Sequence, residues 1–315
     1  MTRLILLAIL LLSLPAISQA QKNDTLVRYF DARLEPCKKK DFVFIGVIIR
    51  DPFGWDGIIY DDSARTIMRG HYRDEACKEK DGWFMYYFAN GKRALSGKYE
   101  NNVRQLTWKS WYPAGQLKDS VQFLNGVQEG IGFSFFENGQ LESSGLYRQG
   151  VLDQDWTFYH ENGKIATKEK YAAGKLSALE CFDTSGSSTG VNCAIKRDPE
   201  IKGRYGGVIK FLKDSLVYPP IAKANNLEGY VIVEFTITKD GSLKDIRILS
   251  SPDQLFNDEV LRVLKSVPGW YPAISHNRML NFTYTLNIPF FVDDPEIHIE
   301  EKGDLRLNEL EFPRD

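Results

Sequence analysis

The chain has 315 residues, a formal net charge of −2 and 43% hydrophobic residues, which is a composition typical of globular domains. Residues 81–178 contain 11 Lys and Arg against 10 Asp and Glu, and residues 205–292 contain 9 against 8. Neither block has the basic excess that neutralises a phosphate backbone, so we expect no nucleic acid partner.

Residues 1–20 have the layout of a secretory signal. Arg3 precedes an apolar run that ends at Leu14, and Ser18-Gln19-Ala20 places small residues before a cleavage site. We expect cleavage after Ala20 and export. The alternative is an uncleaved membrane anchor, but the apolar run is shorter than the about 18–20 residues that span a bilayer. An N-terminal segment, 21–54, follows.

The middle of the chain is an internal repeat. Glycines recur every 24 residues at Gly91, Gly115, Gly139 and Gly163, and aromatic residues keep the same step four residues before and eight residues after each glycine. A degenerate copy at 60–72 has Ala64 in place of the turn glycine, and half a copy follows at 181–186.

Each copy predicts a β-hairpin, because Asn-Gly supplies the positive φ of a two-residue turn and aromatic side chains suit a half-buried pleated surface. A polar joint separates one copy from the next. With this aromatic–NG–GxY layout, residues 55–190 resemble MORN repeats, which implies an elongated antiparallel sheet that mediates contacts. The aromatic side chains are expected to fill the sheet's own core; the alternative is a groove for peptidoglycan or another glycan.

Four cysteines occur, an even number that predicts disulfides in an oxidising compartment. Three pairings are open, and we expect Cys37–Cys77 and Cys181–Cys193, since each pair brackets one end of the repeat block. No pair has the CxxC spacing of a zinc site and no histidine lies nearby at ligand spacing. We therefore predict no metal site and no cofactor.

After a linker at 191–204 the pattern changes to a small α+β domain. Pro220 begins one predicted helix, and "YVIVEFTIT" with "SLKDIRILS" forms a hairpin around Asp240-Gly241. Ser251-Pro252-Asp253-Gln254 predicts a capping box before an amphipathic helix. A last strand alternates through Leu280, Phe282, Tyr284, Leu286 and Ile288. We expect two helices on one face of an antiparallel sheet, so the whole chain is mainly β plus α+β.

Residues 205–292 resemble the TonB C-terminal domain. The resemblance lies in "YP" with Ala222, in "LEGYVIVEFTI", in "WYPA" at 270–273 and in "IPF" at 288–290. It implies a protein of the Gram-negative periplasm that binds a segment of an outer-membrane transporter by β-strand addition. The strand that would contact the partner corresponds to residues 279–288, so Leu280, Phe282, Tyr284, Leu286 and Ile288 are the candidate binding residues. Classical members also keep an N-terminal membrane helix with a functional histidine, whereas residues 1–20 contain no histidine.

No catalytic residues are expected. Gly186-Ser187-Ser188-Thr189-Gly190 matches the G-x-S-x-G string, but it lies in a linker without the strand-to-helix turn that exposes a nucleophile. The four histidines are scattered, and neither a phosphate-binding glycine loop nor HExxH occurs.

Residues 293–315 form an acidic tail with nine acidic and three basic residues. Charge alone predicts a solvated tail. The alternation in "EIHIEE" and "LRLNELEF" instead indicates strands, and an uncovered sheet edge at 280–286 would be an aggregation hazard. We therefore hypothesise that part of 296–312 pairs with this edge and competes with an incoming peptide.

Two functions fit these features. The first is a periplasmic, non-enzymatic TonB-like protein that binds an outer-membrane TonB-dependent transporter or another envelope protein, and so is linked to transport. The second is an envelope scaffold that holds partners or peptidoglycan and has no part in transport.

Overall fold

The computed structural model describes residues 24–203, 207–292 and 299–304. It divides into two compact units, the first containing residues up to Glu180 and the second containing residues from Ser187 onward. The predicted signal peptide and most of the acidic tail lie outside the described residues. Within the described residues no helix is long and apolar enough to cross a membrane.

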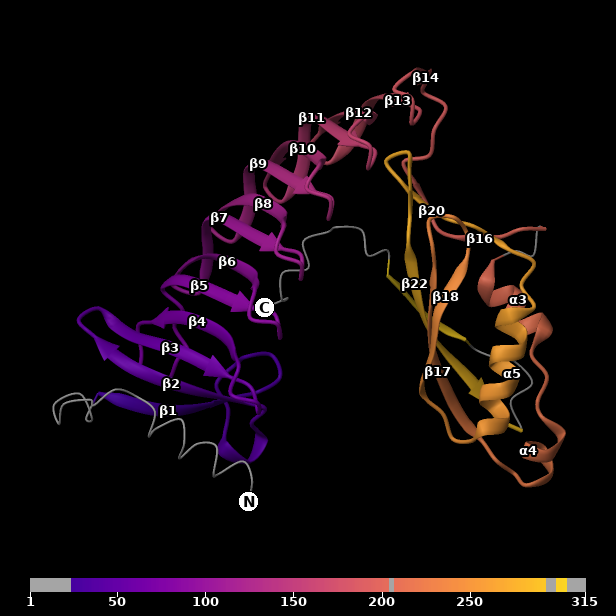
Figure 1. The fold of residues 1–315 in the computed structure, drawn as a ribbon, viewed down its shortest axis with the longest axis horizontal. Helices are drawn as coiled ribbons and strands as arrows, with labels where there is room; N and C mark the ends of the chain where they lie inside the picture. Colours follow the sequence, from indigo (N-terminus) through magenta and orange to yellow (C-terminus); the bar gives the residue numbers. More distant parts are fainter. Residues whose placement is uncertain (1–23, 204–206, 293–298, 305–315) are drawn as a thin grey trace. The chain divides into compact units, whose positions relative to one another are not determined.

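The first unit consists of an antiparallel sheet whose 14 strands follow chain order from the indigo end of Figure 1, and the last strand of this sheet, β14, belongs to the second unit. The sheet already begins in the N-terminal segment, and a 3-10 turn, η1 (Lys39–Asp41), lies between its first two strands. The strands are β1 (Thr25–Phe30), β2 (Phe44–Asp51), β3 (Gly54–Tyr60), β4 (Thr66–Tyr72), β5 (Gly82–Tyr87), β6 (Arg93–Glu100), β7 (Val103–Trp111), β8 (Leu117–Leu124), β9 (Val127–Phe135), β10 (Leu141–Arg148), β11 (Val151–Tyr159), β12 (Ile165–Ala172), β13 (Lys175–Phe182) and β14 (Ser188–Gly190).

The repeat glycines lie in hairpin turns, as predicted, but the turns have three residues instead of two. Phe88 N donates to Lys92 O at 2.9 Å and Gly91 N donates to Phe88 O at 2.8 Å, which is a type I turn closed by a left-handed glycine. Gly91 has φ +80°, and the other three repeat glycines have φ between +80° and +104°. The degenerate copy uses the same turn, with Ala64 at φ +59°.

The polar joints are tight turns too, which the sequence did not reveal. Asn101-Asn102, Asn125-Gly126, Gln149-Gly150 and Ala173-Gly174 keep the 24-residue step, and both residues of each pair have positive φ. Glu100 pairs with Val103, and Leu124 pairs with Val127, so only two residues separate the strands. The joints therefore continue the sheet from one copy to the next.

The turn asparagines connect neighbouring copies. Asn90 Nδ2 donates to Pro113 O at 2.8 Å, Asn138 Nδ2 to Glu161 O at 3.1 Å and Asn162 Nδ2 to Thr184 O at 2.8 Å. Each asparagine also accepts a hydrogen bond from the backbone of its own turn. Ala114 takes this position in the second copy, so the side-chain bonds are missing there.

Ala114→Asn is therefore expected to stabilise the repeat unit by about 0.5–1.5 kcal/mol, the net contribution of one added hydrogen bond. The free energy of unfolding, from urea titration, measures it. Ala89→Asn is the matched control, because Ala89 is exposed and precedes the asparagine position of its own turn. An equal gain in both variants would show that the effect comes from asparagine in turns and not from the connection between copies.

The aromatic side chains form the core of the first unit. Tyr72, Phe84, Tyr99, Trp108 and Phe123 contact one another edge to face in that order, with ring centroids 4.9–6.4 Å apart. All five are at most 7% exposed. This buried row is therefore not accessible to a glycan ring, in keeping with the expected packing role.

The GxY motif makes room for this row. A Cβ on Gly97 would lie 2.1 Å from the Trp108 ring, one on Gly70 would lie 2.2 Å from Phe84, and one on Gly145 would lie 2.2 Å from Trp156. Each glycine thus receives the ring of the next strand, and the tyrosine two residues later adds its own ring to the core.

One of the two predicted disulfides forms. Cys181 and Cys193 are bonded, with Cα atoms 6.2 Å apart, as predicted. The Cys37–Cys77 prediction is wrong in this structure, because both residues are free thiols. Their segments are neighbours, but Cys77 is 1% exposed and packs in the aromatic core, whereas Cys37 lies beside Asp31 and Asp41. Burial raises the pKa of Cys77 to about 12, so it is an inert thiol.

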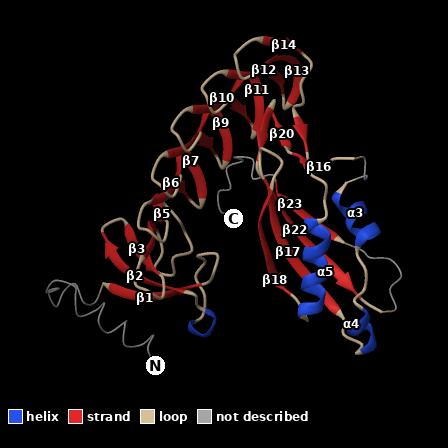
Figure 2. Ribbon diagram, turned by 45° about the vertical axis from the view of Figure 1, so that its right-hand side comes forward, coloured by secondary structure: helices blue, strands red, loops and turns tan. Residues whose placement is uncertain are grey.

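The second unit contains a four-stranded sheet in the order β18-β17-β22-β23. α3, α4 and α5 follow in the same unit, and Figure 2 draws these helices on one side of its strands. The elements are α3 (Val208–Ser215), α4 (Pro220–Ala224), β17 (Gly229–Ile237), β18 (Leu243–Ser250), α5 (Gln254–Lys265), β22 (Phe282–Phe290) and β23 (Glu300–Asp304). The alternating apolar residues of β17 and β22 meet those helices in one core, which includes Phe256 and Trp270.

The helices differ from the prediction in two ways. α3 was not predicted, so the described part of the second unit contains three helices instead of two. α5 begins at Gln254 with Asp253 as its N-cap, and Asp253 Oδ1 accepts from Leu255 N at 2.9 Å. The capping box starting at Ser251 is wrong because Ser251 Oγ donates to Asp253 O instead of capping a helix.

The predicted linker contains two short strands. β15 (Lys196–Arg197) pairs with β20 (Ala273–Ser275), which also pairs with β21 (Arg278–Leu280). β16 (Glu200–Ile201) pairs with β19 (Trp270–Tyr271). These pairings attach residues 196–201 to the second unit.

A candidate partner-binding edge on the second unit

The candidate site is the edge of β22 that faces away from β17. On the β17 side, nine residue pairs run without a register shift from Gly229↔Phe290 to Ile237↔Phe282. On the other side, β23 pairs antiparallel with β22 over five residues, from Thr283↔Asp304 to Asn287↔Glu300. The chain's own C-terminal segment therefore occupies this edge, which confirms the hypothesis that part of 296–312 pairs with the domain.

The predicted binding residues lie in the core. Phe282, Tyr284, Leu286 and Ile288 are 0–3% exposed and belong to the same buried cluster as the helices. Leu280 is not part of β22 at all: it lies in β21, opposite Ala273. The alternation continues across Asn281, where the chain passes from one sheet to another, and alternation alone does not detect such a change.

A partner can contact the backbone of β22 and the side chains on the face of the strand that points away from the core. Thr283, Thr285 and Asn287 alternate with the core residues and are partly exposed. Thr283 Oγ1 lies 3.0 Å from Thr236 Oγ1, and Asn287 Oδ1 is buried without a hydrogen-bond partner among the described residues. A partner strand would therefore meet backbone groups first and a row of small polar side chains second.

Burial of its apolar side chains in the core holds β22 in a fixed position. Fully burying one such side chain stabilises the fold by about 1.5–3 kcal/mol, and four of them face the helices. Pairing with β17 and burial against the helices hold β22 independently of β23. Removal of β23 should accordingly leave β22 in place with one row of backbone groups uncovered.

The opposite edge of the sheet is protected in a way that β22 is not. β18 is the other outer strand, and its pairing with β17 has two register shifts. Asp245 in β18 has φ +53°, and Lys244 and Arg247 place charges on the strand. Bulges and charges are devices that prevent strand addition. β22 is unshifted on both sides, so it is the edge suited to receive a strand.

These features agree with the families that the chain matches. Residues 214–291 match the Gram-negative bacterial TonB protein C-terminal family. The repeats at 104–125, 128–149 and 155–173 match the MORN repeat variant. The first match includes β17, β18, α5 and β22, and the second covers most of β7 to β12.

The chain also has curated relatives. It is 46% identical over 52 residues to Protein TonB of Pseudomonas aeruginosa, which is 16% of this chain and 15% of that protein. It is 38% identical over 56 residues to Protein TonB of Helicobacter pylori strain J99, which is 18% of this chain and 20% of that protein. The chain thus spans a fifth or less of the curated relatives that it matches.

Proposed function

We propose that the chain is a non-enzymatic periplasmic protein whose TonB-like domain binds an outer-membrane TonB-dependent transporter, or another envelope protein, by strand addition at the β22 edge. β23 occupies that edge in the absence of a partner, so the partner strand and β23 compete. The observation that supports the proposal is the antiparallel pairing of β22 with the chain's own β23, at the edge where a partner strand would add.

The similarity to two TonB proteins supports a transporter segment as the competing strand. The repeat sheet contributes a second surface, on which Trp83 is 61% and Phe133 is 39% exposed. An envelope scaffold that holds peptidoglycan through such residues is the second candidate function.

A proline scan of the ligand tests strand addition without altering the protein. The probe is a synthetic peptide with the sequence of a periplasmic segment of a TonB-dependent transporter, titrated calorimetrically into the mature chain. In an antiparallel pair, alternate residues direct their N–H groups to the neighbouring strand, and proline removes that donor. We expect proline to weaken binding at every second peptide position and to be tolerated at the positions between.

Uniform tolerance of proline along the peptide would contradict strand addition. Sedimentation of the chain with purified murein sacculi is the parallel measurement for the scaffold function. Retention on sacculi together with no binding to the peptide or to a purified transporter would favour the scaffold and reject the transport-linked proposal.

A further inference from the structure

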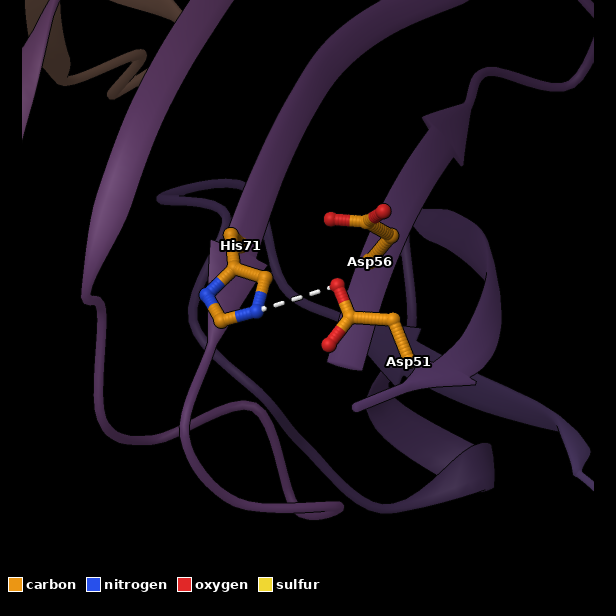
Figure 3. Close-up of side chains that lie close together, drawn as sticks. All are labelled: Asp51, Asp56 and His71. Carbon is orange, nitrogen blue, oxygen red and sulfur yellow. Dashed lines mark ion pairs between the residues drawn. The ribbon is translucent and has the colours of Figure 1, made fainter. Parts of the chain in front are cut away.

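A histidine and two aspartates meet on the first unit, outside the aromatic core of the repeats. Asp51 ends β2, Asp56 lies in β3 and His71 lies in β4. Asp56 and His71 are directly opposite each other in the β3–β4 pair. One side-chain ligand atom from each of the three lies within 4.8 Å of the other two, and Figure 3 shows the imidazole edge facing the two carboxylates.

The histidine is held with one nitrogen directed at the aspartates. His71 Nδ1 lies 2.6 Å from Asp81 O, and a carbonyl oxygen only accepts, so Nδ1 carries the proton. In the neutral ring, Nε2 then holds a lone pair, and it faces Asp51 Oδ2 at 3.4 Å. Nε2 is buried and has no hydrogen-bond partner among the described residues. Two acceptor atoms that face each other repel unless a proton or a metal cation lies between them.

Asp51 is held in a similar way. Its Oδ1 accepts from Phe53 N at 2.6 Å and from Gly54 N at 2.7 Å, which leaves Oδ2 directed at the histidine. Gly54 also makes room for the ring, because a Cβ there would lie 2.8 Å from His71 Cε1 and 3.0 Å from Nε2. A ligand whose second atom is fixed by a backbone group is the usual arrangement around protein-bound metals.

The spacing fits a tetrahedral transition metal. Zinc bonds of about 2.0–2.1 Å place tetrahedral ligand atoms about 3.3–3.4 Å apart. His71 Nε2 and Asp51 Oδ2 already have this separation. Asp56 is exposed, so its carboxylate reaches the third position by side-chain rotation.

We propose that Asp51, Asp56 and His71 form a binding site for a divalent transition-metal cation, and Zn²⁺ is the ion we expect. One imidazole nitrogen and two carboxylate oxygens suit zinc better than calcium or magnesium, which prefer oxygen ligands alone. Bound metal would join the ends of β2, β3 and β4. The site lies in a different unit from the β22 edge and does not depend on the proposed partner.

The alternative is an ion pair between a protonated His71 and Asp51, which needs no contribution from Asp56. Asp56→Asn distinguishes the two, because the side chain is exposed and nearly isosteric, so the fold should be unaffected. His71→Gln removes the imidazole. Asp62→Asn is the matched control, since Asp62 is an exposed aspartate in the turn between β3 and β4.

The experiment titrates ZnCl₂ into the mature, tag-free chain by calorimetry and follows the melting temperature with and without zinc. We expect one zinc per chain and a zinc-dependent rise in melting temperature for the parent and for Asp62→Asn. Asp56→Asn should bind at least tenfold more weakly, His71→Gln should lose the rise, and CaCl₂ should give none. No zinc binding by the parent, or equal binding by Asp56→Asn, would overturn the proposal.

Discussion

Truncation after Val292 is expected to raise the affinity of the TonB-like domain for a transporter-derived peptide about tenfold. β23 covers five residues of the β22 edge, and a peptide binds only to the fraction of molecules in which β23 has left. The apparent dissociation constant equals the intrinsic one divided by that fraction. If β23 pairing stabilises the closed state by about 1.4 kcal/mol, its removal lowers the constant about tenfold.

A reversible disulfide that holds β23 on β22 tests the same competition in the opposite direction from truncation. Thr285 and Lys302 are directly opposed in the β22–β23 pair, at a separation suited to a disulfide. Thr285→Cys combined with Lys302→Cys, in a Cys37→Ser background, should abolish peptide binding when oxidised and restore it when reduced. Cys77 needs no replacement, because its buried thiol does not react.

Thr285→Cys alone is the matched control and should bind like the parent under both redox conditions. Calorimetry measures all three proteins and the truncated chain. Two results together would show that β23 does not compete with the peptide for the β22 edge. One is equal affinity of the full-length and truncated chains, and the other is undiminished binding by the oxidised double-cysteine variant.

The sequence predicted the sheet strands well where local chemistry determines them. The glycines at 91, 115, 139 and 163 occur in turns because left-handed φ there is a local requirement. The joints were not predicted as turns, although Asn125-Gly126 has the same Asn-Gly signal; Gln149 and Ala173 adopt positive φ without a local preference for it. The flanking strands hold them in that conformation, and this depends on the sheet as a whole.

Long-range features were predicted less well. Leu280 continues the alternation of β22, yet it belongs to another sheet, and only the pairing with Ala273 reveals this. Spacing placed Cys37 with Cys77 but carries no information about which of the two thiols is buried in the core. Asp56 and His71 are 15 residues apart, and only the β3–β4 register places them opposite each other. The tail strand was predicted because an uncovered apolar edge strand promotes aggregation in any protein.

Gly97→Ala is expected to destabilise the repeat unit by about 1–3 kcal/mol, the usual cost of overpacking. A Cβ at this position would lie 2.1, 2.2 and 2.5 Å from three atoms of the Trp108 ring. The ring has little room to rotate, because Tyr99 and Phe123 contact it at centroid distances of 4.9 and 6.4 Å. Gly97 does not have a positive φ, so alanine introduces no backbone strain and the whole loss comes from the clash.

Tryptophan fluorescence during urea unfolding measures this effect selectively, because five of the six tryptophans precede residue 181. Ser96→Ala is the matched control: it changes the adjacent position on the other face of β6 and should alter the free energy of unfolding by no more than about 0.5 kcal/mol. Trp108→Phe alone should also destabilise the unit, because it leaves a cavity.

Combining Gly97→Ala with Trp108→Phe tests whether the glycine and the ring act as one unit. The smaller ring leaves space for the new methyl group, so the double variant should lose less free energy than the sum of the two single losses, by about 0.5 kcal/mol or more. Strictly additive losses would mean that Gly97 is needed for another reason. The GxY motif would then lack the role assigned to it, in which each glycine receives the aromatic ring of the next strand.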